Sequence, residues 1–351
     1  MATAADLRSS EQFSRSYAPA KIQGCFEGKH IVTVEQFARA DMHTLFDTTT
    51  DLRQRVRSGD RSVLKICAGK VMATLFYEAS TRTDMSFQAA MLRLGGEVIS
   101  TSGGVQFSSV YKGENLADTV RAVGCYADIV VLRHPEVGSS YEAAHYLDQL
   151  GGRLGRQPIV ISAGDGIGEH PTQALLDLFT IFDFKQDVNN LRIALVGDLR
   201  NGRTVHSLSK LIAQYEAVGT ILDFVSPPSL RMPAETLEFL QSRSIEVHET
   251  EDLHDVLGTA DVIYWTRIQQ ERFANLADYE AIADHFIMTP DLLAEAKSDA
   301  ILMHPLPRKH EMGTTTDHDI LDADPRSVYF NQMENGMFVR MALVAKVLGS
   351  E

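Results

Sequence analysis

The stretch Ile129-Val130-Val131-Leu132-Arg133-His134-Pro135 decides the fold class that the sequence predicts. Its first half is wholly apolar. Such a run is typical of a strand covered on both faces, since a strand with one wet face alternates apolar and polar residues. Ile193-Ala194-Leu195-Val196 has the same character. Strands covered on both faces predict a parallel sheet flanked by helices.

Outward from these two runs, short β-rich segments alternate with helical patterns between about residues 70 and 305. The predicted strands are residues 71–77, 97–100, 128–133, 158–162, 192–197, 221–225, 261–266 and 300–304. Apolar residues at helical spacing predict helices around 87–94, 116–127 and 175–182, and a last helix is predicted over 337–348. The alternation predicts an α/β protein with open parallel sheets.

At 351 residues the chain is long enough for two domains. Gly164-Asp165-Gly166-Ile167-Gly168 lies near the middle, and a helix is predicted from about Pro171, so we expect the hinge there. The first domain is predicted to be residues 1–168 and the second residues 169–325. Residues 326–351 hold the C-terminal helix, which can pack on either domain. Functional residues are expected just after the strands, where open α/β sheets bind ligands.

The bulk composition excludes several classes of protein. A formal net charge of −14 argues against nucleic-acid binding, because phosphate backbones repel such a surface. No apolar run is long enough to predict a membrane span. Cys25, Cys67 and Cys125 fit neither a disulfide framework nor a zinc site, and predict reduced thiols in a cytoplasmic protein. Residues 1–23 lack the apolar core of a secretory signal, and a frayed tail is favoured over a transit peptide.

The segment Phe76-Tyr77-Glu78-Ala79-Ser80-Thr81-Arg82-Thr83 follows a predicted strand and opens a predicted helix. The free amide groups of a helix N-terminus bind phosphate. The hydroxyl groups of Ser80, Thr81 and Thr83 add donors, and the guanidinium of Arg82 matches phosphate oxygens. From the spacing alone, an ordinary helix cap with a surface arginine is an equal alternative.

Two further motifs supply groups that suit a carbonyl compound. Arg133 ends a predicted strand, from which it can reach a cleft, although a solvated arginine is the simpler interpretation. His170 and Gln173, in Gly168-Glu169-His170-Pro171-Thr172-Gln173, share one helix face. A histidine can donate to an oxygen on which negative charge develops, and a glutamine suits an amide. A capping turn with a satisfied histidine is the alternative.

The second half of the chain also places polar groups after strands. Arg203 lies in the strand-to-helix turn 196–204 and suits a carboxylate, while Arg267 and Gln269 follow the strand that ends near residue 266. His304-Pro305-Leu306-Pro307 is a rigid turn whose carbonyl groups can accept from a substrate amide. The alternatives are a plain turn with solvated arginines around Arg203, a solvated polar loop around Arg267 and Gln269, and a merely structural turn at residues 304–307. Ser108 and Lys112 lie in a polar loop that alone predicts only a flexible surface segment.

Cations at the ends of elements in an acidic chain predict a small ligand set with several negative charges. The cations are Arg82, Lys112, Arg133, Arg203 and Arg267. No nucleophile elbow, Walker loop, HExxH or CxxC motif accompanies them. We therefore expect direct group transfer driven by positioning and electrostatics.

These motifs carry a resemblance to a known family. The run from Phe76 to Thr83 resembles the carbamoyl-phosphate signature of the aspartate/ornithine carbamoyltransferase family, and His170-Pro171-Thr172-Gln173 resembles its second hallmark. The turn His304-Pro305-Leu306-Pro307 resembles that of aspartate-using members, since ornithine-using members have a cysteine there. Two arginines for the acceptor also suit a dicarboxylate, whereas the cationic side chain of ornithine would be repelled.

The resemblance implies a two-domain α/β fold, each domain having a parallel β-sheet flanked by helices. Residues 1–168, completed by the C-terminal helix within 326–351, would bind carbamoyl phosphate, and residues 169–325 would bind L-aspartate. The implied activity is transfer of the carbamoyl group to the amine of L-aspartate, an early step of de novo pyrimidine biosynthesis. No metal or organic cofactor is implied.

Residue by residue, the resemblance implies three sets of contacts. The phosphate would be held by Ser80, Thr81, Arg82 and Thr83; the carbonyl and amide by Arg133, His170, Gln173 and the backbone of Pro305 and Leu306; and the carboxylates of aspartate by Arg203, Arg267 and Gln269. Thr83, Arg133 and His170 would stabilise the oxyanion. Ser108 and Lys112 would come from a neighbouring subunit, which implies a homotrimer with shared active sites.

Asp84 departs from the family pattern, in which Arg or Ser is usual at this position. A carboxylate beside a phosphate site weakens anion binding unless it is paired, and Arg82 or a neighbouring subunit is the expected partner. Two rival hypotheses stay open: transfer to another amino acid, and a non-catalytic subunit that retains the fold. A regulatory partner is neither indicated nor excluded by the sequence.

Overall fold

The computed structural model describes residues 9–101, 113–269, 273, 275, 279, 282, 286–309, 311–314 and 316–351. The chain forms two compact units. Unit 1 is Met1–Leu175 with Gly336–Glu351, and unit 2 is Leu176–Asn335. Both divisions lie inside long helices, α6 (Pro171–Lys185) and α12 (Tyr329–Val347). The limits placed from the sequence, after residues 168 and 325, come before these positions.

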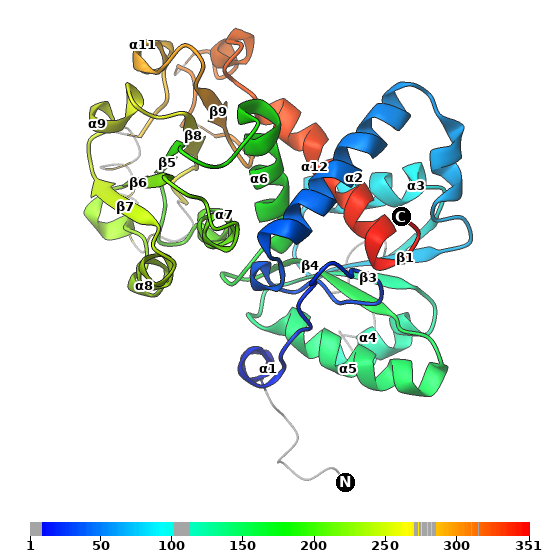
Figure 1. Ribbon diagram of the computed structural model, residues 1–351. Helices are drawn as coiled ribbons and strands as arrows, with labels where there is room; N and C mark the ends of the chain where they lie inside the picture. The colour runs from blue at the N-terminus through cyan, green and yellow to red at the C-terminus, as the bar shows by residue number, and fades with distance from the viewer. Residues whose placement is uncertain are drawn as a thin grey trace. The chain divides into compact units, whose positions relative to one another are not determined.

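Unit 1 is built on a parallel sheet with the strand order β2-β1-β3-β4 (Figure 1). The strands are β1 (Val71–Phe76), β2 (Glu97–Ser100), β3 (Ile129–His134) and β4 (Ile159–Asp165). The apolar strands β1, β3 and β4 are buried along most of their length, whereas the edge strand β2 is largely exposed. The parallel sheet predicted from the apolar run at 129–132 is therefore confirmed.

The helices of unit 1 lie on both faces of its sheet. They are α1 (Ser10–Ser16), α2 (Arg39–Arg57), α3 (Thr81–Arg93), α4 (Leu116–Gly124) and α5 (Ser139–Leu154), with 3-10 turns η1 (Val34–Gln36) and η2 (Arg61–Lys65). Helix α3 covers one face, and α4 and α5 cover the other (Figure 1). The chain leaves β1 toward β2 but leaves β3 toward β4, so the strand order reverses between β1 and β3. A crevice for ligands opens outside the carboxyl ends of strands at such a switch point.

Helix α3 follows the apolar spacing that predicted it. Phe87, Ala90, Met91 and Leu94 are fully buried. The helix ends at Arg93, and Gly95 then takes a φ of +81°, where a Cβ atom would lie 1.8 Å from the carbonyl oxygen of a residue in η2. Glycine alone fits both this backbone conformation and this approach, so the helix stops there, as the sequence predicted.

Unit 2 is built on a second parallel sheet with the order β7-β6-β5-β8-β9. The strands are β5 (Arg192–Val196), β6 (Ile221–Val225), β7 (Glu246–Thr250), β8 (Val262–Trp265) and β9 (Ile301–Met303). The order reverses between β5 and β8, which places a second switch point there. Strand β7 was not predicted, because it is a largely exposed edge strand without an apolar run.

Helices also cover both faces of the second sheet. Besides α6 and α12, they are α7 (Arg203–Gln214), α8 (Ala234–Ser242), α9 (His254–Leu257) and α11 (Pro290–Glu295), with 3-10 turns η5 (Pro228–Leu230) and η7 (Ile320–Ala323). Helices α7 and α8 lie together on one side of the sheet, and α9 and α11 lie together on the other (Figure 1). Trp265, at the end of β8, is fully buried in the core beneath α9 and α11.

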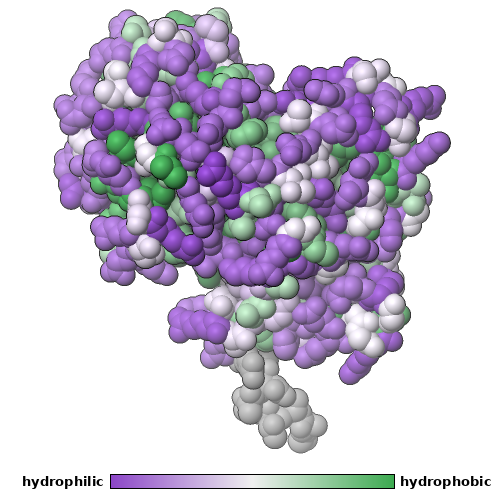
Figure 2. All heavy atoms as spheres, in the orientation of Figure 1, coloured by the Kyte–Doolittle hydropathy of each residue, from purple (hydrophilic) through white to green (hydrophobic). Residues whose placement is uncertain are grey.

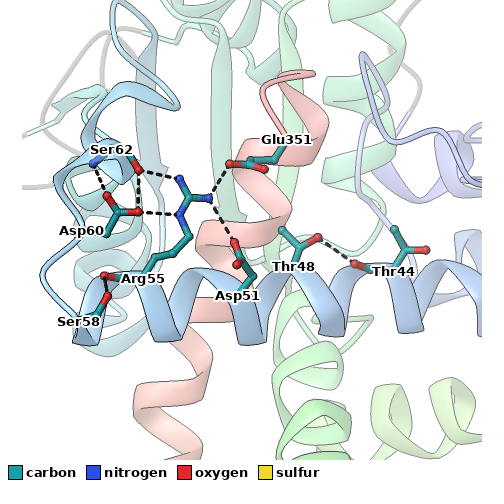
Figure 3. Close-up of polar contacts among 8 residues, drawn as sticks. All are labelled: Thr44, Thr48, Asp51, Arg55, Ser58, Asp60, Ser62 and Glu351. Atoms are coloured by element: carbon teal, nitrogen blue, oxygen red, sulfur yellow. Dashed lines mark hydrogen bonds and ion pairs between the residues drawn. The ribbon is translucent and has the colours of Figure 1, made fainter.

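The C-terminal residues of unit 1 are held by a cluster around Arg55, near the end of α2 (Figure 3). Arg55 donates to Glu351 at 2.9 Å and to Asp51, Asp60 and Ser62 at 3.2 Å each. These contacts join α2, η2 and the last residue of the chain.

Helix α12 itself begins at residue 329, well before the start at 337 that the sequence predicted.

Hydrophilic residues predominate on the face shown in Figure 2, and hydrophobic residues form small groups. No helix in the part of the chain that the structure describes is both long and apolar enough to cross a membrane. Cys25, Cys67 and Cys125 are free thiols.

Candidate functional site

The start of α3 lies at the switch point of unit 1, directly after β1. Ser80 is the N-cap residue, and its side chain makes no capping hydrogen bond. Among the described residues, none accepts a hydrogen bond from the backbone amide groups of Thr81, Arg82 or Thr83. Free amide groups and the positive end of the helix dipole together form a phosphate-binding group.

A pocket of about 460 Å³ opens at this helix start. Its lining residues are Ser80 and Thr81 together with Thr74, Phe76, Tyr77, Ala79, Asp84, Met85, Ser100 and Thr101. They come from the first five residues of α3, from β1 and the segment that joins it to α3, and from the end of β2 and the residue after it. The size and the hydroxyl-bearing wall suit a small phosphorylated molecule.

Arg82 is an exposed cation at the same helix start. No hydrogen bond or ion pair joins its side chain to any residue within the described ranges. Partial burial lowers the pKa of Arg82, yet a guanidinium stays charged at neutral pH. Its charge is therefore available to an anion bound at α3.

Asp84 lines the pocket, and its carboxylate accepts a hydrogen bond from Gln88 Nε2 at 2.8 Å. The sequence led us to expect Arg82 or a neighbouring subunit as its partner, and the Arg82 expectation is wrong. A neutral amide leaves the negative charge of Asp84 in place. That charge opposes an anion in the pocket.

Arg133 lies on β3, paired in register with Phe76 of β1. It is 9% exposed, its Nη1 donates to the carbonyl oxygen of Ala163 at 3.1 Å, and its Nη2 lies 3.5 Å from a carboxylate oxygen of Glu78. Arg133 is thus a buried cation with a fixed direction, at the other side of the switch point from α3. This excludes the solvated arginine that the spacing alone favoured.

His170 immediately precedes α6 and Gln173 lies in its first turn, a few residues after the end of β4, and both are buried. The turn before them is held by Asp165, whose carboxylate accepts the amide of Glu169 at 2.7 Å and that of Gly138 at 2.9 Å. The predicted groups after β1, β3 and β4 therefore share the carboxyl edge of one sheet.

Arg203 and Arg267 flank the switch point of unit 2. Arg203 is the first residue of α7, after β5, while Arg267 and Gln269 follow β8, which pairs with β5. Gly197, at the end of β5, has a φ of +115°, and a Cβ atom there would lie 2.2 Å from the carbonyl oxygen of Thr266. The two arginines therefore follow strands whose carboxyl ends are in close contact, which only glycine permits.

The turn that holds Pro305 and Leu306 follows β9, the neighbour of β8. Leu306 has a positive φ of 54°, and its amide donates to Nδ1 of His304 at 2.9 Å. In the described part of the chain, no group donates a hydrogen bond to the carbonyl oxygen of Pro305 or Leu306. Both carbonyl groups are free to accept from a ligand.

Some site residues were missed by the sequence reasoning, and others are not described. Thr74, Ser100 and Thr101 line the pocket but were not singled out. Ser100 and Thr101 stand at the end of a predicted strand, which is a usable signal only once β2 is known to lie beside β1. Ser108 and Lys112 lie outside the described residues.

The chemistry of these groups is that of anion binding. They supply cations, hydroxyl and amide donors and two free carbonyl groups, which suits substrate positioning and oxyanion stabilisation. No group of three or more His, Cys, Asp or Glu side chains that the structure describes is placed to hold a metal ion.

Two family models match the chain. Residues 29–183 match the carbamoyl-P binding domain of aspartate/ornithine carbamoyltransferase, and residues 189–347 match its Asp/Orn binding domain.

Three similar proteins illustrate the range of relatives. The multifunctional protein CAD of Squalus acanthias is 49% identical over 92% of this chain, which spans only 14% of that relative. The aspartate carbamoyltransferase catalytic subunit of Clostridium novyi is 42% identical, over 93% of this chain and 99% of the relative. The crystal structure of aspartate transcarbamoylase from Trypanosoma cruzi with carbamoyl phosphate and aspartate is 39% identical, with a TM-score of 0.82, over 93% of this chain and 98% of that one.

Proposed function

Because the chain belongs to the aspartate/ornithine carbamoyltransferase family, we propose that it transfers the carbamoyl group of carbamoyl phosphate to the α-amine of L-aspartate. The products are N-carbamoyl-L-aspartate and phosphate, an early step of de novo pyrimidine biosynthesis. The Clostridium and Trypanosoma relatives are named for this activity. The observation that carries the proposal is the presence of anion-binding groups at the switch point of each sheet.

The phosphate of carbamoyl phosphate binds at the start of α3. The free amide groups of Thr81, Arg82 and Thr83 donate to its oxygens, the hydroxyl group of Ser80 adds a donor, and Arg82 supplies the opposite charge. Arg82 is suited to this role because no described residue competes for its guanidinium.

The carbamoyl group is held by Arg133, His170 and Gln173 and by the carbonyl oxygens of Pro305 and Leu306. Arg133 and His170 are buried, so their charge or dipole acts in a medium that screens it little. The two free carbonyl groups accept from the carbamoyl amide, which has two N–H donors.

Aspartate binds through Arg203, Arg267 and Gln269. Two guanidinium groups match two carboxylates, and an ornithine side chain would meet repulsion here. Arg203 also stands at the N-terminus of α7, whose dipole favours an anion.

The reaction needs no covalent enzyme intermediate. Carbamoyl phosphate binds first, and the neutral amine of aspartate then attacks its carbonyl carbon, so that a C–N bond forms and negative charge develops on the oxygen. Thr83, Arg133 and His170 stabilise that oxyanion. The bond to the phosphate oxygen then breaks, and the phosphate leaves with the bonding electrons and accepts the amine proton. Neither a metal ion nor an organic cofactor takes part.

The catalytic unit is a homotrimer in which Ser108 and Lys112 reach a neighbouring subunit's site. Large apolar side chains on α3 and β2 support this, because Met85 is 64%, Leu92 is 56% and Ile99 is 42% exposed. Met85 also lines the pocket at α3, so a protomer that covers this apolar area would complete the pocket. Sedimentation equilibrium should give a single species with three times the mass of the protomer.

We place the protein in the cytoplasm, on the basis of its three free cysteines. Fractionation of the source cells tests this location.

The test of the activity is an acceptor assay. The protein is incubated with carbamoyl phosphate and, in turn, L-aspartate, L-ornithine and other amino acids, and phosphate release is measured above the spontaneous rate. Aspartate should be the preferred acceptor. Faster release with ornithine or another amino acid would assign a different transferase, and no release with any acceptor would favour a non-catalytic subunit.

A further inference from the structure

His304 is a buried histidine whose two ring nitrogens have different fixed partners. It is 1% exposed, its Nδ1 lies 2.9 Å from the amide nitrogen of Leu306, and its Nε2 lies 3.1 Å from Glu311 Oε1. A backbone amide can only donate, so Nδ1 must carry a lone pair rather than a proton. The ring proton is therefore on Nε2 and is donated to Glu311.

Glu311 holds this tautomer from the other side. Its two carboxylate oxygens each accept from the amide of Lys309 at 3.1 Å. Burial alone would raise the pKa of Glu311, but the hydrogen bond from His304 and those from the backbone amides outweigh it and lower that pKa. An ionised carboxylate is acceptor-only, so it requires a proton on Nε2. The neutral ring thus has one allowed proton position.

The backbone of His304 is fixed by a second set of buried contacts. Its amide donates to Gln332 Oε1 at 3.0 Å, and Gln332 Nε2 donates to Asp177 at 2.6 Å. The other oxygen of Asp177 accepts from the hydroxyl group of Tyr264 at 2.7 Å. Gln332, Asp177 and Tyr264 are all fully buried. Helices α6 and α12 and strand β8 therefore determine where the imidazole stands.

Leu306, which the imidazole holds, has an unusual backbone conformation. Leu306 has a φ of 54°, a left-handed conformation that costs a non-glycine residue about 1 kcal/mol or more unless its surroundings impose it. The hydrogen bond from its amide to His304 Nδ1 supplies such a constraint. In this conformation no described donor occupies the carbonyl oxygen of Pro305 or Leu306.

We propose that His304 is a positioning residue, whose unprotonated Nδ1 holds Leu306 so that the carbonyl oxygens of Pro305 and Leu306 accept from the carbamoyl amide. The inference rests on the proposed function and deepens it. It gives the histidine of this turn a role through the backbone, without contact between its ring and the substrate. A purely structural histidine would stabilise the turn but would not matter to recognition of an N–H group.

Two variants separate the ring nitrogens. In His304→Asn, the shorter amide side chain places an oxygen near the position of Nδ1, so it can still accept from Leu306 but cannot reach Glu311. In His304→Gln, the longer side chain places a donor near the position of Nε2 and offers nothing at Nδ1. Both are neutral polar residues, so the pair controls for burial and for loss of the ring.

Two ligands separate recognition of the amide NH₂ group from recognition of the carbonyl and phosphonate groups. Phosphonoacetamide carries an NH₂ group where 2-oxopropylphosphonate carries a methyl group, and the two are otherwise alike. Isothermal titration of the trimeric protein should show the amide bound about tenfold more tightly by the wild type, as expected for two net hydrogen bonds. His304→Asn should keep most of this tenfold preference for the amide. His304→Gln should lose the preference and have a lower kcat. Both variants should retain the wild-type affinity for inorganic phosphate.

The outcomes distinguish this inference from the proposed function. A wild type that binds neither phosphonate contradicts the function itself. If the wild type binds both phosphonates but the two variants show the same ratio of amide to ketone affinity, the role of Nδ1 is overturned. This holds whether both variants keep the wild-type ratio or both lose it. Should His304→Gln fail to fold, ¹⁵N-histidine spectra of the wild type decide, with the His304 signals identified by their loss in His304→Asn. An unprotonated Nδ1 is expected, and a protonated one overturns the proposal.

Discussion

Replacing Arg82 with alanine separates binding from folding more cleanly than any other change at the phosphate site. Arg82 is exposed and joins no described residue, so its loss leaves no buried group unpaired, and the free energy of unfolding should change by less than about 0.5 kcal/mol. A hydrogen bond to a charged group contributes about 1.5–3 kcal/mol. Carbamoyl phosphate should therefore bind about 10- to 150-fold more weakly. kcat should also fall, because negative charge builds up on the departing phosphate.

The assay is the initial rate of phosphate release with saturating L-aspartate and varied carbamoyl phosphate, together with thermal unfolding. Arg93→Ala is the matched control, because Arg93 is an exposed arginine at the opposite end of α3. The control should leave both kcat and KM unchanged. A change of less than about threefold in kcat/KM for Arg82→Ala would refute the phosphate assignment, since even one such hydrogen bond predicts more.

Three other changes test separate parts of the account. Asp84→Asn removes the negative charge from the pocket while keeping an acceptor for Gln88, so inorganic phosphate should bind about fivefold more tightly at low salt, and unchanged binding would show that Asp84 does not face the anion. Because the pKa of Glu311 is lowered in the folded protein, its ionisation stabilises the fold above the ordinary pKa of 4.5, and this stabilisation is lost as the pH falls through the folded value. The free energy of unfolding in urea should therefore fall less steeply with decreasing pH in Glu311→Gln than in the wild type. Equal pH dependences in the two proteins would contradict this. Arg55→Ala breaks three partly exposed ion pairs and should cost about 1–2 kcal/mol in urea unfolding, more than Arg15→Ala, whose single pair is far more exposed; equal losses would contradict the clustering.

The parallel sheets were predictable because their central strands carry an unbroken apolar run. Residues 129–132 and 193–196 need no neighbour to show that both of their faces are covered. Strand β7 has no such run, since Glu246, His248 and Glu249 are exposed on an edge strand that pairs with β6 alone. Its place is set by backbone pairing, which leaves little trace in composition.

The early start of α12 was hidden for a different reason. Gln332 and Asn335 lie in its first half and interrupt the apolar spacing, yet both are buried. They are satisfied by hydrogen bonds to Asp177 and Thr180 of α6. Partners so distant in sequence cannot be read from helical periodicity, because the pattern records only which residues are apolar.

The motifs of the candidate site could be predicted from the sequence, but the burial and the partners of its residues could not. Ser80 and Arg82 were singled out from the strand-to-helix context, and the structure places them at that junction. Arg133 looked solvated from its spacing, and only the strand order shows that it is buried beside β1. The pairing of His304 with Glu311 was not foreseen, because nothing in the local sequence indicates that Glu311 is buried.

The most direct measurement is a crystal structure of the protein with a bisubstrate mimic that joins a phosphonate to two carboxylates. We expect the phosphonate to bind to the amide groups of Thr81, Arg82 and Thr83, and the carboxylates to bind to Arg203 and Arg267. A mimic bound away from α3, or with its carboxylates far from both arginines, would contradict the claim that the two switch points hold the two substrates.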